Sequence, residues 1–475
     1  MPLFKARTNA PVVVYRDLPV RSGPLTWGQR WTWDIIQELV PHEKRINLGL
    51  AVPVDGQRRV ADVLTALSDV MTRFETLRTT FRVGVDGEPT QVVSGAGTLP
   101  VEMCDAGDEP AEAVASALAE SLASHRFDLE AGPLLRWGIV MVGDHPRAVA
   151  VGMSNMVVDG WGLRLLRHQL WSRLSDQVDG GWKPTGQVGE TWQPLDQARY
   201  EQSTPGRELA RGGFEYWREQ LSAIRAIPPP NWRPVGETPR YWCAEFVSTA
   251  LAQATHQVAA RLRVPPSAAL LAGFAAVLGA RTGQRALGLA VVVNNRFTRR
   301  ATNSLGKFFQ SAPICLDLDV DSLEELVQRT ARDLLRAARH GRSDPLAVAR
   351  LVHTDGPYRG AHLALPVIYD FHGVPDLTVR PEPVSPEALA RLAVGSKLQW
   401  VDAVEQENMR LFTQVRRLSD EARVTMWLDT HFLSRADLAA LVVDVERLLV
   451  TLVHGDVPTT ELMAAMRVAT AASAP

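Results

Sequence analysis

The sequence predicts an α/β protein of two lobes, each with helices packed on a sheet. Short runs rich in Val, Ile and Leu, typical of buried strands, alternate along the chain with segments whose apolar residues recur every three or four positions, as on one face of a helix. Residues 177–194, rich in Gly, Gln, Thr and Trp, interrupt this alternation, which then begins again. A chain of 475 residues is long enough for two or three domains. We therefore expect one lobe over residues 1–194 and a second over residues 195–475.

The first lobe is expected to alternate strands and helices. The helical pattern is clear over residues 60–74, where Val63, Leu67 and Val70 fall on one face, and it gives way over residues 77–83 to a run that suits a strand. In order, we expect a strand over 11–16, a helix from Thr26, a strand over 46–52, the helix over 60–74, a strand over 77–83, a helix over 112–124, strands over 134–142 and 147–151, and a helix over 163–174.

The second lobe repeats the alternation after a stiff, proline-rich connector over residues 228–239. Two of its expected strands, over 411–416 and 422–429, are close enough in the sequence to form a hairpin, so we expect mixed sheets. In order, we expect a helix over 214–221, a strand over 241–249, helices over 251–262 and 267–281, strands over 286–293 and 312–318, a helix over 322–339, strands over 365–371, 411–416 and 422–429, and a helix over 434–453. The tail from Pro458 is expected to fray.

Composition and charge exclude several classes of function. The chain carries 51 basic and 53 acidic residues, a formal net charge of -2, so it has no electrostatic footprint for nucleic acid or a membrane surface. Residues 1–15 lack the apolar core of a signal peptide, and the most apolar long segment, over 268–280, is too short to span a bilayer. Three scattered cysteines show neither metal-ligand spacing nor a disulfide framework. These observations predict a cytoplasmic protein that binds neither nucleic acid nor a membrane.

Residues 152–162 (GMSNMVVDGWG) form the most informative stretch of the chain. An alternating apolar run over 147–151 precedes them, and a run with leucines on one helical face follows over 163–174. The carboxylate of Asp159 suits the start of that helix, because it can accept the free amide protons of the first turn. This strand, turn and helix is either a capped turn inside a core or a way of presenting side chains in a cleft.

Several catalytic motifs fit the sequence poorly. Residues 152–156 nearly match the Gly-x-Ser-x-Gly nucleophile elbow, but the last Gly, which permits the sharp turn, is missing, and this argues against a serine hydrolase. There is no Gly-rich phosphate loop, and His42-Glu43 lacks the second His of a His-Glu-x-x-His site. The 11 histidines are dispersed, so we expect no metal site.

Six stretches, in one order along the chain, match the motifs of a known family. They are residues 26–33 (TWGQRWTW), 73–81 (RFETLRTTF), 127–136 (FDLEAGPLLR), 214–221 (FEYWREQL), 295–296 (NR) and 305–311 (LGKFFQS). The second and third match closely, whereas Gln310 stands where Asn is usual. With these stretches the chain resembles the condensation domains of nonribosomal peptide synthetases, members of the chloramphenicol-acetyltransferase-like superfamily of acyltransferases. The resemblance covers about residues 20–453.

The resemblance implies a fold and a substrate route. Two chloramphenicol-acetyltransferase-like lobes would form a V-shaped pseudo-dimer around a central tunnel, which the phosphopantetheine arms of two carrier proteins would enter from opposite faces. Met153, Trp161, Gln310 and Ser311 are expected to line this tunnel. The protein would bind no cofactor of its own, because the phosphopantetheine arm belongs to the carrier protein, and it would be a monomer.

The central motif of the family, His-His-x-x-x-Asp-Gly, is degenerate in this chain. Ser154 and Asn155 stand at the two His positions, whereas Asp159 and Gly160 keep the rest. In the family the second His accepts a proton from the attacking amine or orients it, a task that suits an imidazole. Asn155 takes up no proton at a working pH, but its amide can orient the amine or hold a developing oxyanion. Ser154 is a weaker candidate as nucleophile, because no base is adjacent in the sequence.

Two further assignments follow from the resemblance. The carboxylate of Asp159 is expected to shape the turn by pairing with an arginine, Arg296 as first choice and Arg78 as second, because a buried carboxylate is costly without a partner. Gly160 would let the backbone approach the substrate closely. His372, at the end of a strand that faces the tunnel in the family, is either a replacement base or a histidine in a surface turn.

Two functions remain open on these grounds. The first is a free-standing condensation-type acyltransferase that joins a carrier-bound acyl or peptidyl thioester to an amine without the usual histidine. The second is a catalytically inactive platform that binds carrier proteins and recruits a tailoring enzyme, and an unusual reaction such as cyclisation of a carrier-bound intermediate is a third class. The arginines of the helix over 322–339 form either a contact for an acidic carrier protein or a solvated face, in which Glu324 and Asp333 are interleaved.

Overall fold

The structure is a computed structural model. It describes residues 5–6, 10–176, 192–225, 227, 235–353, 365, 367–372, 384–407 and 409–458. Most of the predicted linker over 177–194, part of the predicted connector over 228–239 and the tail beyond Pro458 lie outside the described residues.

The chain divides into two units that are not continuous in sequence. The first unit combines Met1–Ala210 with Asn294–Gln310, and the second combines Arg211–Val293 with Ser311–Pro475. This division differs from the predicted boundary between residues 194 and 195 in two respects. Residues 195–210 belong to the first unit, and so does the segment 294–310, which comes from the second half of the chain.

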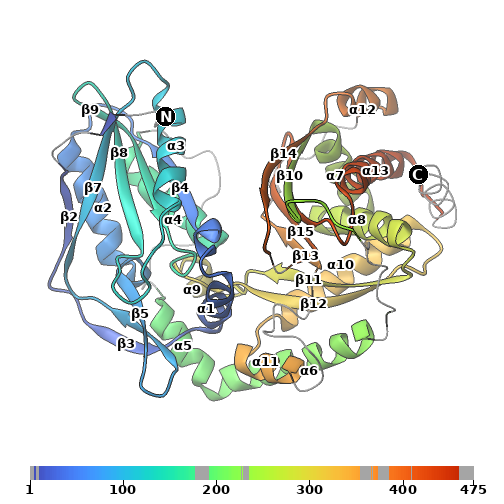
Figure 1. Cartoon of the computed structure of the whole chain (residues 1–475), viewed down its shortest axis with the longest axis horizontal. Helices are drawn as coiled ribbons and strands as arrows, with labels where there is room; N and C mark the ends of the chain where they lie inside the picture. The colour runs from blue at the N-terminus through green and yellow to red at the C-terminus, as the bar shows by residue number, and fades with distance from the viewer. Residues whose placement is uncertain are drawn as a thin grey trace. The chain divides into compact units, whose positions relative to one another are not determined.

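A six-stranded sheet forms the centre of the first unit (Figure 1). Its strands lie in the order β1 (Lys5–Ala6), β7 (Gly97–Asp105), β8 (Leu135–Val142), β9 (His145–Met153) and β4 (Leu48–Pro53), with β2 (Val12–Tyr15) also paired to β7. β8 and β9 form an antiparallel hairpin, in which Ile139 lies opposite Val149. The strands predicted over 134–142 and 147–151 form this hairpin.

Helices cover both faces of this sheet. The side chains of β9 are larger on one face than on the other. Val149 and Val151 lie in an apolar cluster with α2 (Val60–Arg73) and α4 (Gly160–Leu174), whereas Ala148 and Ala150 lie in a second cluster with α3 (Ala111–Ala123). Gly152 continues the series of small residues, since a Cβ atom there would lie 2.3 Å from the backbone of α3. The end of β9 is therefore fixed from both sides.

Smaller elements complete the first unit. They are the three-stranded sheet of β3 (Arg21–Pro24), β6 (Pro89–Val93) and β5 (Thr79–Val83), the helices α1 (Trp27–Leu39), α5 (Pro194–Gln202) and α9 (Arg299–Thr302), and the 3-10 turns Glu43–Ile46 and Glu75–Arg78. Thr26 and Gln29 form a capping box at the start of α1, in which each side chain accepts the other's backbone amide proton. The predicted helix start at Thr26 is thus confirmed.

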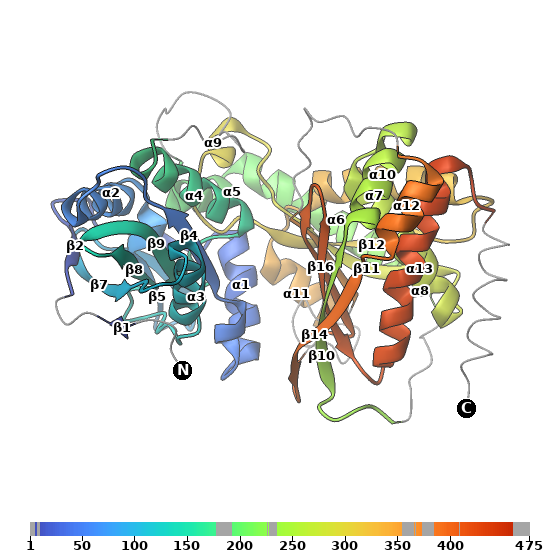
Figure 2. The same ribbon diagram turned by 90° about the horizontal axis from the view of Figure 1, so that it is seen from above.

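A seven-stranded mixed sheet forms the centre of the second unit (Figures 1 and 2). Its strands lie in the order β12 (Gln310–Asp317), β11 (Ala286–Val293), β13 (Val367–Phe371), β15 (Leu411–Leu418), β16 (Ala422–Asp429), β10 (Tyr241–Ser248) and β14 (Lys397–Val404). β13 pairs in parallel with β11 and β15, and the strands from β15 to β14 pair antiparallel. β15 and β16 form the predicted hairpin, with Phe412 opposite Trp427.

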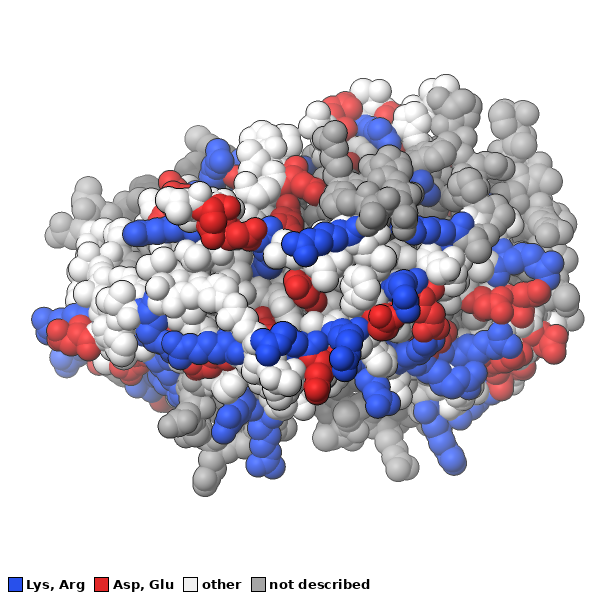
Figure 3. Space-filling model, turned by 90° about the horizontal axis from the view of Figure 1, so that it is seen from below, with Lys and Arg blue, Asp and Glu red and all other residues white. Residues whose placement is uncertain are grey.

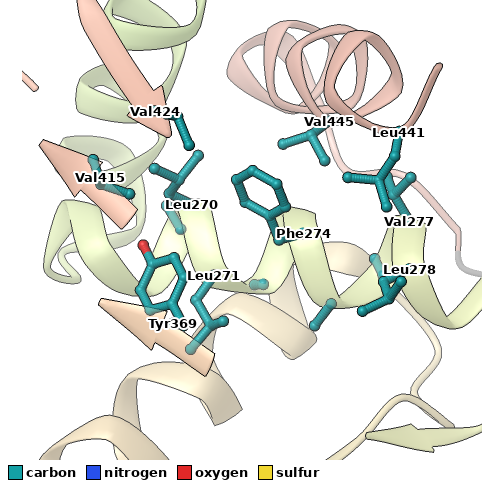
Figure 4. Packing of buried hydrophobic residues seen from close by; sticks show 14 of the residues in the cluster. Leu270, Leu271, Phe274, Val277, Leu278, Tyr369, Val415, Val424, Leu441 and Val445 are labelled. Carbon is teal, nitrogen blue, oxygen red and sulfur yellow. The ribbon is translucent and has the colours of Figure 1, made fainter. Parts of the chain in front are cut away.

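A helix that is apolar except at its two ends, α8 (Pro266–Thr282), lies in the core of the second unit (Figure 4). Leu270 and Phe274 pack between Val424 of the sheet and Val445 of α13 (Arg435–His454). A helix that is hydrophobic all round needs such burial on every side. The remaining helices are α6 (Thr204–Arg225), α7 (Thr249–Leu262), α10 (Leu323–His340), α11 (Pro345–His353) and α12 (Pro386–Ala393). Among the described residues, no single helix has the length and apolarity needed to cross a membrane, and α7 and α8 meet that test only together, as a pair bent by 110°.

Candidate functional site

The strand, turn and helix predicted around residues 152–162 is present between β9 and α4. The backbone amide of Ser154 donates to the carbonyl of Leu134, and the Ser154 hydroxyl accepts the amide proton of Met156. The side chains of Met156, Val157 and Val158 are buried in the core of the first unit. Ser154 is itself buried, and its hydroxyl shapes the turn. The hydroxyl of Ser154, the weaker candidate for a nucleophile, thus has a structural role in the turn.

Asp159 stands at the centre of a buried polar cluster. Its Oδ1 accepts the amide proton of Gly162 at 2.8 Å and so caps α4, as the sequence predicts. Its Oδ2 lies 2.5 Å from a guanidinium nitrogen of Arg296 and 2.9 Å from the amide nitrogen of Phe308. The predicted ion pair with Arg296 is therefore present. Arg78, the second choice, instead donates to the carbonyl of Ser94.

Arg296 ties residues 294–310 to the turn after β9. The side chain is fully buried, donates to the carbonyl of Gly306 at 3.1 Å, and lies over the ring of Phe308 at 4.3 Å from its centre. Burial by itself would raise the pKa of Asp159. The charges of Arg296 and Lys307 and two backbone amides instead hold the pKa of this carboxyl below its ordinary value. Asp159 is therefore a carboxylate at neutral pH, and it holds two distant parts of the first unit together.

Lys307 contacts Asn155 and was not predicted from the sequence. The ammonium group of Lys307 donates to the side-chain oxygen of Asn155, the residue predicted to stand at the second His position of the motif. Only 1% of the Lys307 residue surface is exposed, and its nitrogen lies 4.0 Å from the centre of the Phe309 ring. A lysine inside the otherwise apolar run Leu305 to Phe309 is the signal that could have identified it.

Two of the residues predicted to line a tunnel have well-defined places in the first unit. The indole N–H of Trp161, in the first turn of α4, donates to the carbonyl of Thr302 at 2.9 Å. Met153 is fully buried in the apolar core, opposite Leu48 and Leu135 in the sheet. The side chain of Met153 thus belongs to the core around β9. Gly160 is the first residue of α4 and follows the capping carboxylate.

The other two tunnel candidates follow one another in β12. Gln310, the last residue of the first unit, accepts a hydrogen bond from the side-chain amide of Asn295 at 3.2 Å. Asn295 adopts a positive φ of 56°, which Asn tolerates better than most residues. Ser311 is the first residue of the returning segment of the second unit, and both Gln310 and Ser311 are buried. Their predicted role in a tunnel stays a prediction.

His372 lies in the second unit, directly after β13. Its ring Nε2 lies 2.6 Å from the carboxylate of Asp370, which also accepts a hydrogen bond from Gln414. Its backbone amide donates to the carbonyl of Val415, so both the backbone and the ring are fixed. A carboxylate that holds one ring nitrogen is a common way to orient a histidine. The catalytic role of His372 stays a prediction.

Charges of both signs share the described surface. On α10, which bears the arginines considered for carrier binding, Arg329 pairs with Glu325, and Arg336 pairs with Glu219. Side chains of both charge signs lie on the face drawn in Figure 3, with wide uncharged areas between them. These pairs favour a solvated, mixed face for α10. Among the described residues, no group of three His, Cys, Asp or Glu side chains could hold a metal ion.

Comparison with known families places the buried cluster in context. The family model of the condensation domain matches residues 21–352, which include the turn after β9 and the segment 294–310. The chain belongs to the condensation domain family. Asn155 and Asp159 of this condensation domain lie within the matched range. The resemblance identified from the six sequence stretches is confirmed.

Curated relatives of this condensation domain are much longer than the chain. It is 26% identical over 349 residues to chondramide synthase cmdD of Chondromyces crocatus, a match that covers 71% of this chain and 9% of that protein. It is 28% identical over 326 residues to phosphinothricin tripeptide synthetase PhsC of Streptomyces viridochromogenes, covering 64% and 29% of the two chains. The chain thus spans less than a third of either protein's length.

Solved structures share the fold of this condensation domain. The condensation domain that mediates chain release from the enacyloxin polyketide synthase superposes with a TM-score of 0.69 at 19% identity, over 91% of this chain and 82% of that one. The epimerization domain from the third module of tyrocidine synthetase B gives 0.65 at 15% identity, over 95% and 99%. The predicted α/β fold with two chloramphenicol-acetyltransferase-like lobes is confirmed, and its place in nonribosomal peptide and related natural-product biosynthesis follows from the family.

Proposed function

We propose that this condensation domain is an acyltransferase that joins a carrier-bound acyl or peptidyl thioester to an amine without a catalytic histidine in its central motif. The observation that carries the proposal is the intact frame of the motif. Asp159 keeps its buried partner Arg296 and its cap on α4, and Asn155 is held at the second His position by Lys307. A frame that fixes a polar side chain at the family's reaction centre supports catalysis by positioning.

The proposed reaction needs no residue that takes up a proton. The amine nitrogen forms the amide bond with the thioester carbonyl carbon, the carbon–sulfur bond breaks, and the proton lost by the nitrogen ends on the departing thiolate. The amine must arrive in its uncharged form, because Asn155 does not act as a base. Loss of general-base help costs about 10²- to 10⁴-fold in rate, and orientation of the reactants can contribute more than this.

A carrier protein is the proposed partner. The relatives are synthetases and the solved relatives include domains of such synthetases, which supports a thioester delivered on a phosphopantetheine arm. The chain would then bind no cofactor of its own and would work as a monomer. An acyl chain bound in this way reaches the protein already activated, so the protein's task is to bring it to the amine.

Product analysis tests the proposal. The protein is mixed with a carrier protein loaded with an aminoacyl or acyl thioester and with a panel of amines and alcohols, and the products are weighed by mass spectrometry. We expect the amide with an amine acceptor and a lower rate with an alcohol, which depends more on a base. Asn155→Ala should lower the rate, whereas Asp176→Asn, a change at an exposed carboxylate of the same unit, should not. A product that has lost water without gaining the acceptor would indicate cyclisation instead.

The same assay decides the role of His372. If this residue supplies the base, His372→Ala should lower the rate and change the shape of the pH–rate profile. An unchanged rate and profile in this variant would rule out the replacement base. Asp370→Asn serves as a second probe, because it weakens the contact that orients the ring.

One observation favours a second function. At the central motif, Ser154 is used by the turn and the oxygen of Asn155 is used by Lys307, so neither position offers a group that accepts a proton. This suits an inactive platform that binds carrier proteins and recruits a tailoring enzyme. Absence of turnover with every loaded carrier and acceptor, together with stable binding of a loaded carrier and a tailoring enzyme, would support the platform and contradict the acyltransferase.

A further inference from the structure

The contact between Lys307 and Asn155 fixes which atom of the Asn155 amide faces outward. A lysine ammonium has three N–H donors and no acceptor, so the atom of Asn155 that faces it must be the oxygen. The amide nitrogen, with its two N–H groups, then points away from Lys307. No described residue accepts a hydrogen bond from this nitrogen. The position therefore offers a donor where the family has an imidazole.

Three groups that attract a cation surround the side-chain nitrogen of Lys307. Its nitrogen lies over the face of Phe309 and against the oxygen of Asn155, and its charge interacts with the carboxylate of Asp159. An aromatic face, an amide oxygen and a carboxylate all attract a cation. The backbone of Lys307 is held as well, because its carbonyl accepts the hydroxyl proton of Thr26. Lys307 is thus a fixed donor that is nearly closed off from solvent.

We propose that Lys307 is a positioning residue, which holds the amide nitrogen of Asn155 toward the thioester carbonyl so that the site stabilises an oxyanion rather than accepting a proton. This inference rests on the proposed acyltransferase function. During attack by the amine, the carbonyl oxygen gains negative charge, and a donor already aimed at it lowers the barrier without rearrangement. Asn155 would touch the substrate, and Lys307 would act through Asn155.

A kinetic double-mutant cycle tests this relation. We expect Asn155→Ala to lower kcat about 10²- to 10³-fold, the usual effect of removing one oxyanion donor. Lys307→Met, similar in length but uncharged, should lower kcat about 10- to 100-fold with little change in KM, because the donor is misplaced. In the double variant Lys307→Met should have no further effect, since the side chain through which it acts is gone. Lys397→Met, at an exposed lysine of the second unit, is the control.

Asn155→Asp provides a test that does not depend on Lys307→Met being folded. A carboxylate keeps an oxygen for Lys307 but loses the N–H donors, so thermal stability should rise while kcat falls as far as in Asn155→Leu. The gain in stability should vanish when Lys307 is changed to Met, and this readout needs no substrate. A wild-type rate in Asn155→Asp, or multiplicative losses in the kinetic cycle of an active protein, would overturn the inference alone. Absence of turnover in the wild-type protein would overturn the proposed function and with it the role of Lys307.

Discussion

Replacement of Asp159 should harm folding before it harms chemistry. Asp159→Ala removes the carboxylate from a fully buried Arg296 and also removes the cap of α4. Removal of one partner from a buried ion pair costs about 3–5 kcal/mol, and loss of a helix cap costs about 1 kcal/mol. Asp159→Asn keeps an oxygen for the amide of Gly162, but it loses the charge and places an NH2 group where Arg296 and the amide of Phe308 need an acceptor. We therefore expect Asp159→Asn to be destabilised by about 3–5 kcal/mol and Asp159→Ala by about 1 kcal/mol more.

The loss of stability on removing one partner of an ion pair depends on how deeply the pair is buried. An exposed pair in the same unit is therefore a suitable control. Asp176 lies 2.8 Å from Arg58, but 67% of the Asp176 side chain is exposed. Exposed ion pairs contribute at most about 1 kcal/mol, and Asp176→Asn should stay within that limit. The double change Asp159→Asn with Arg296→Met should be more stable than Asp159→Asn alone, because no uncompensated charge then remains in the interior.

Denaturant unfolding followed by circular dichroism measures these differences, with activity compared per folded molecule. The pKa of Asp159 lies below its ordinary value in the folded protein, so its contribution to stability is complete above about pH 4, the usual carboxyl range, and is lost as the pH falls through the lowered pKa. The wild-type protein should lose this part of its stability on acidification, and Asp159→Asn should lack it. A well-folded Asp159→Asn protein of wild-type stability that has selectively lost activity would refute the reasoning.

Two further predictions concern packing and thiol chemistry. Gly28→Ala should destabilise the first unit by about 1–3 kcal/mol in denaturant unfolding, because a Cβ atom there would lie 2.5 Å from the carbonyl oxygen of Lys307, whereas Gly455→Ala faces open space and should be nearly neutral. Burial raises the pKa of the Cys243 thiol to about 12, so at pH 8 almost none of it is thiolate, and an aromatic disulfide reagent should modify the half-buried Cys315 first and reach Cys243 only on unfolding. Fast modification of Cys243 in the native protein would contradict this.

Much of the fold can be predicted where burial leaves a clear period in the sequence, although β7, whose buried residues alternate, is not among the expected strands. β8, β9, α8 and α13 each bury enough apolar surface to show it, and all are expected from the sequence. β14 is not, because it is an edge strand whose side chains are all exposed or half-buried, and they alternate only over its first five residues. α11 is not among the expected helices either, although Val348 and Val352, four residues apart, are both buried. Two buried valines are too few to reveal a helical period in the sequence.

The site could be predicted only where a local residue demands a distant partner. A buried carboxylate at a helix start needs a cation, and the family resemblance indicated Arg296, 137 residues away in the sequence, as its first-choice partner. Nothing in the sequence demands a partner for Asn155, whose amide is satisfied by water as well as by protein. Its contact with Lys307 is a property of the fold, which brings the segment 294–310 back to the first unit.

The frame of the motif and its chemistry are carried by different atoms. Asp159 uses both carboxylate oxygens within the first unit, for Gly162 on one side and for Arg296 and Phe308 on the other, and none of these bonds involves positions 154 or 155. Position 155 can therefore change without loss of the bonds that Asp159 makes. Because Lys307 is a donor, it admits an acceptor oxygen at position 155 and would compete for the lone pair of any imidazole placed there. In the proposed mechanism Asn155 and Lys307 therefore act together: Lys307 orients Asn155, and the N–H groups of Asn155 take the place of a base.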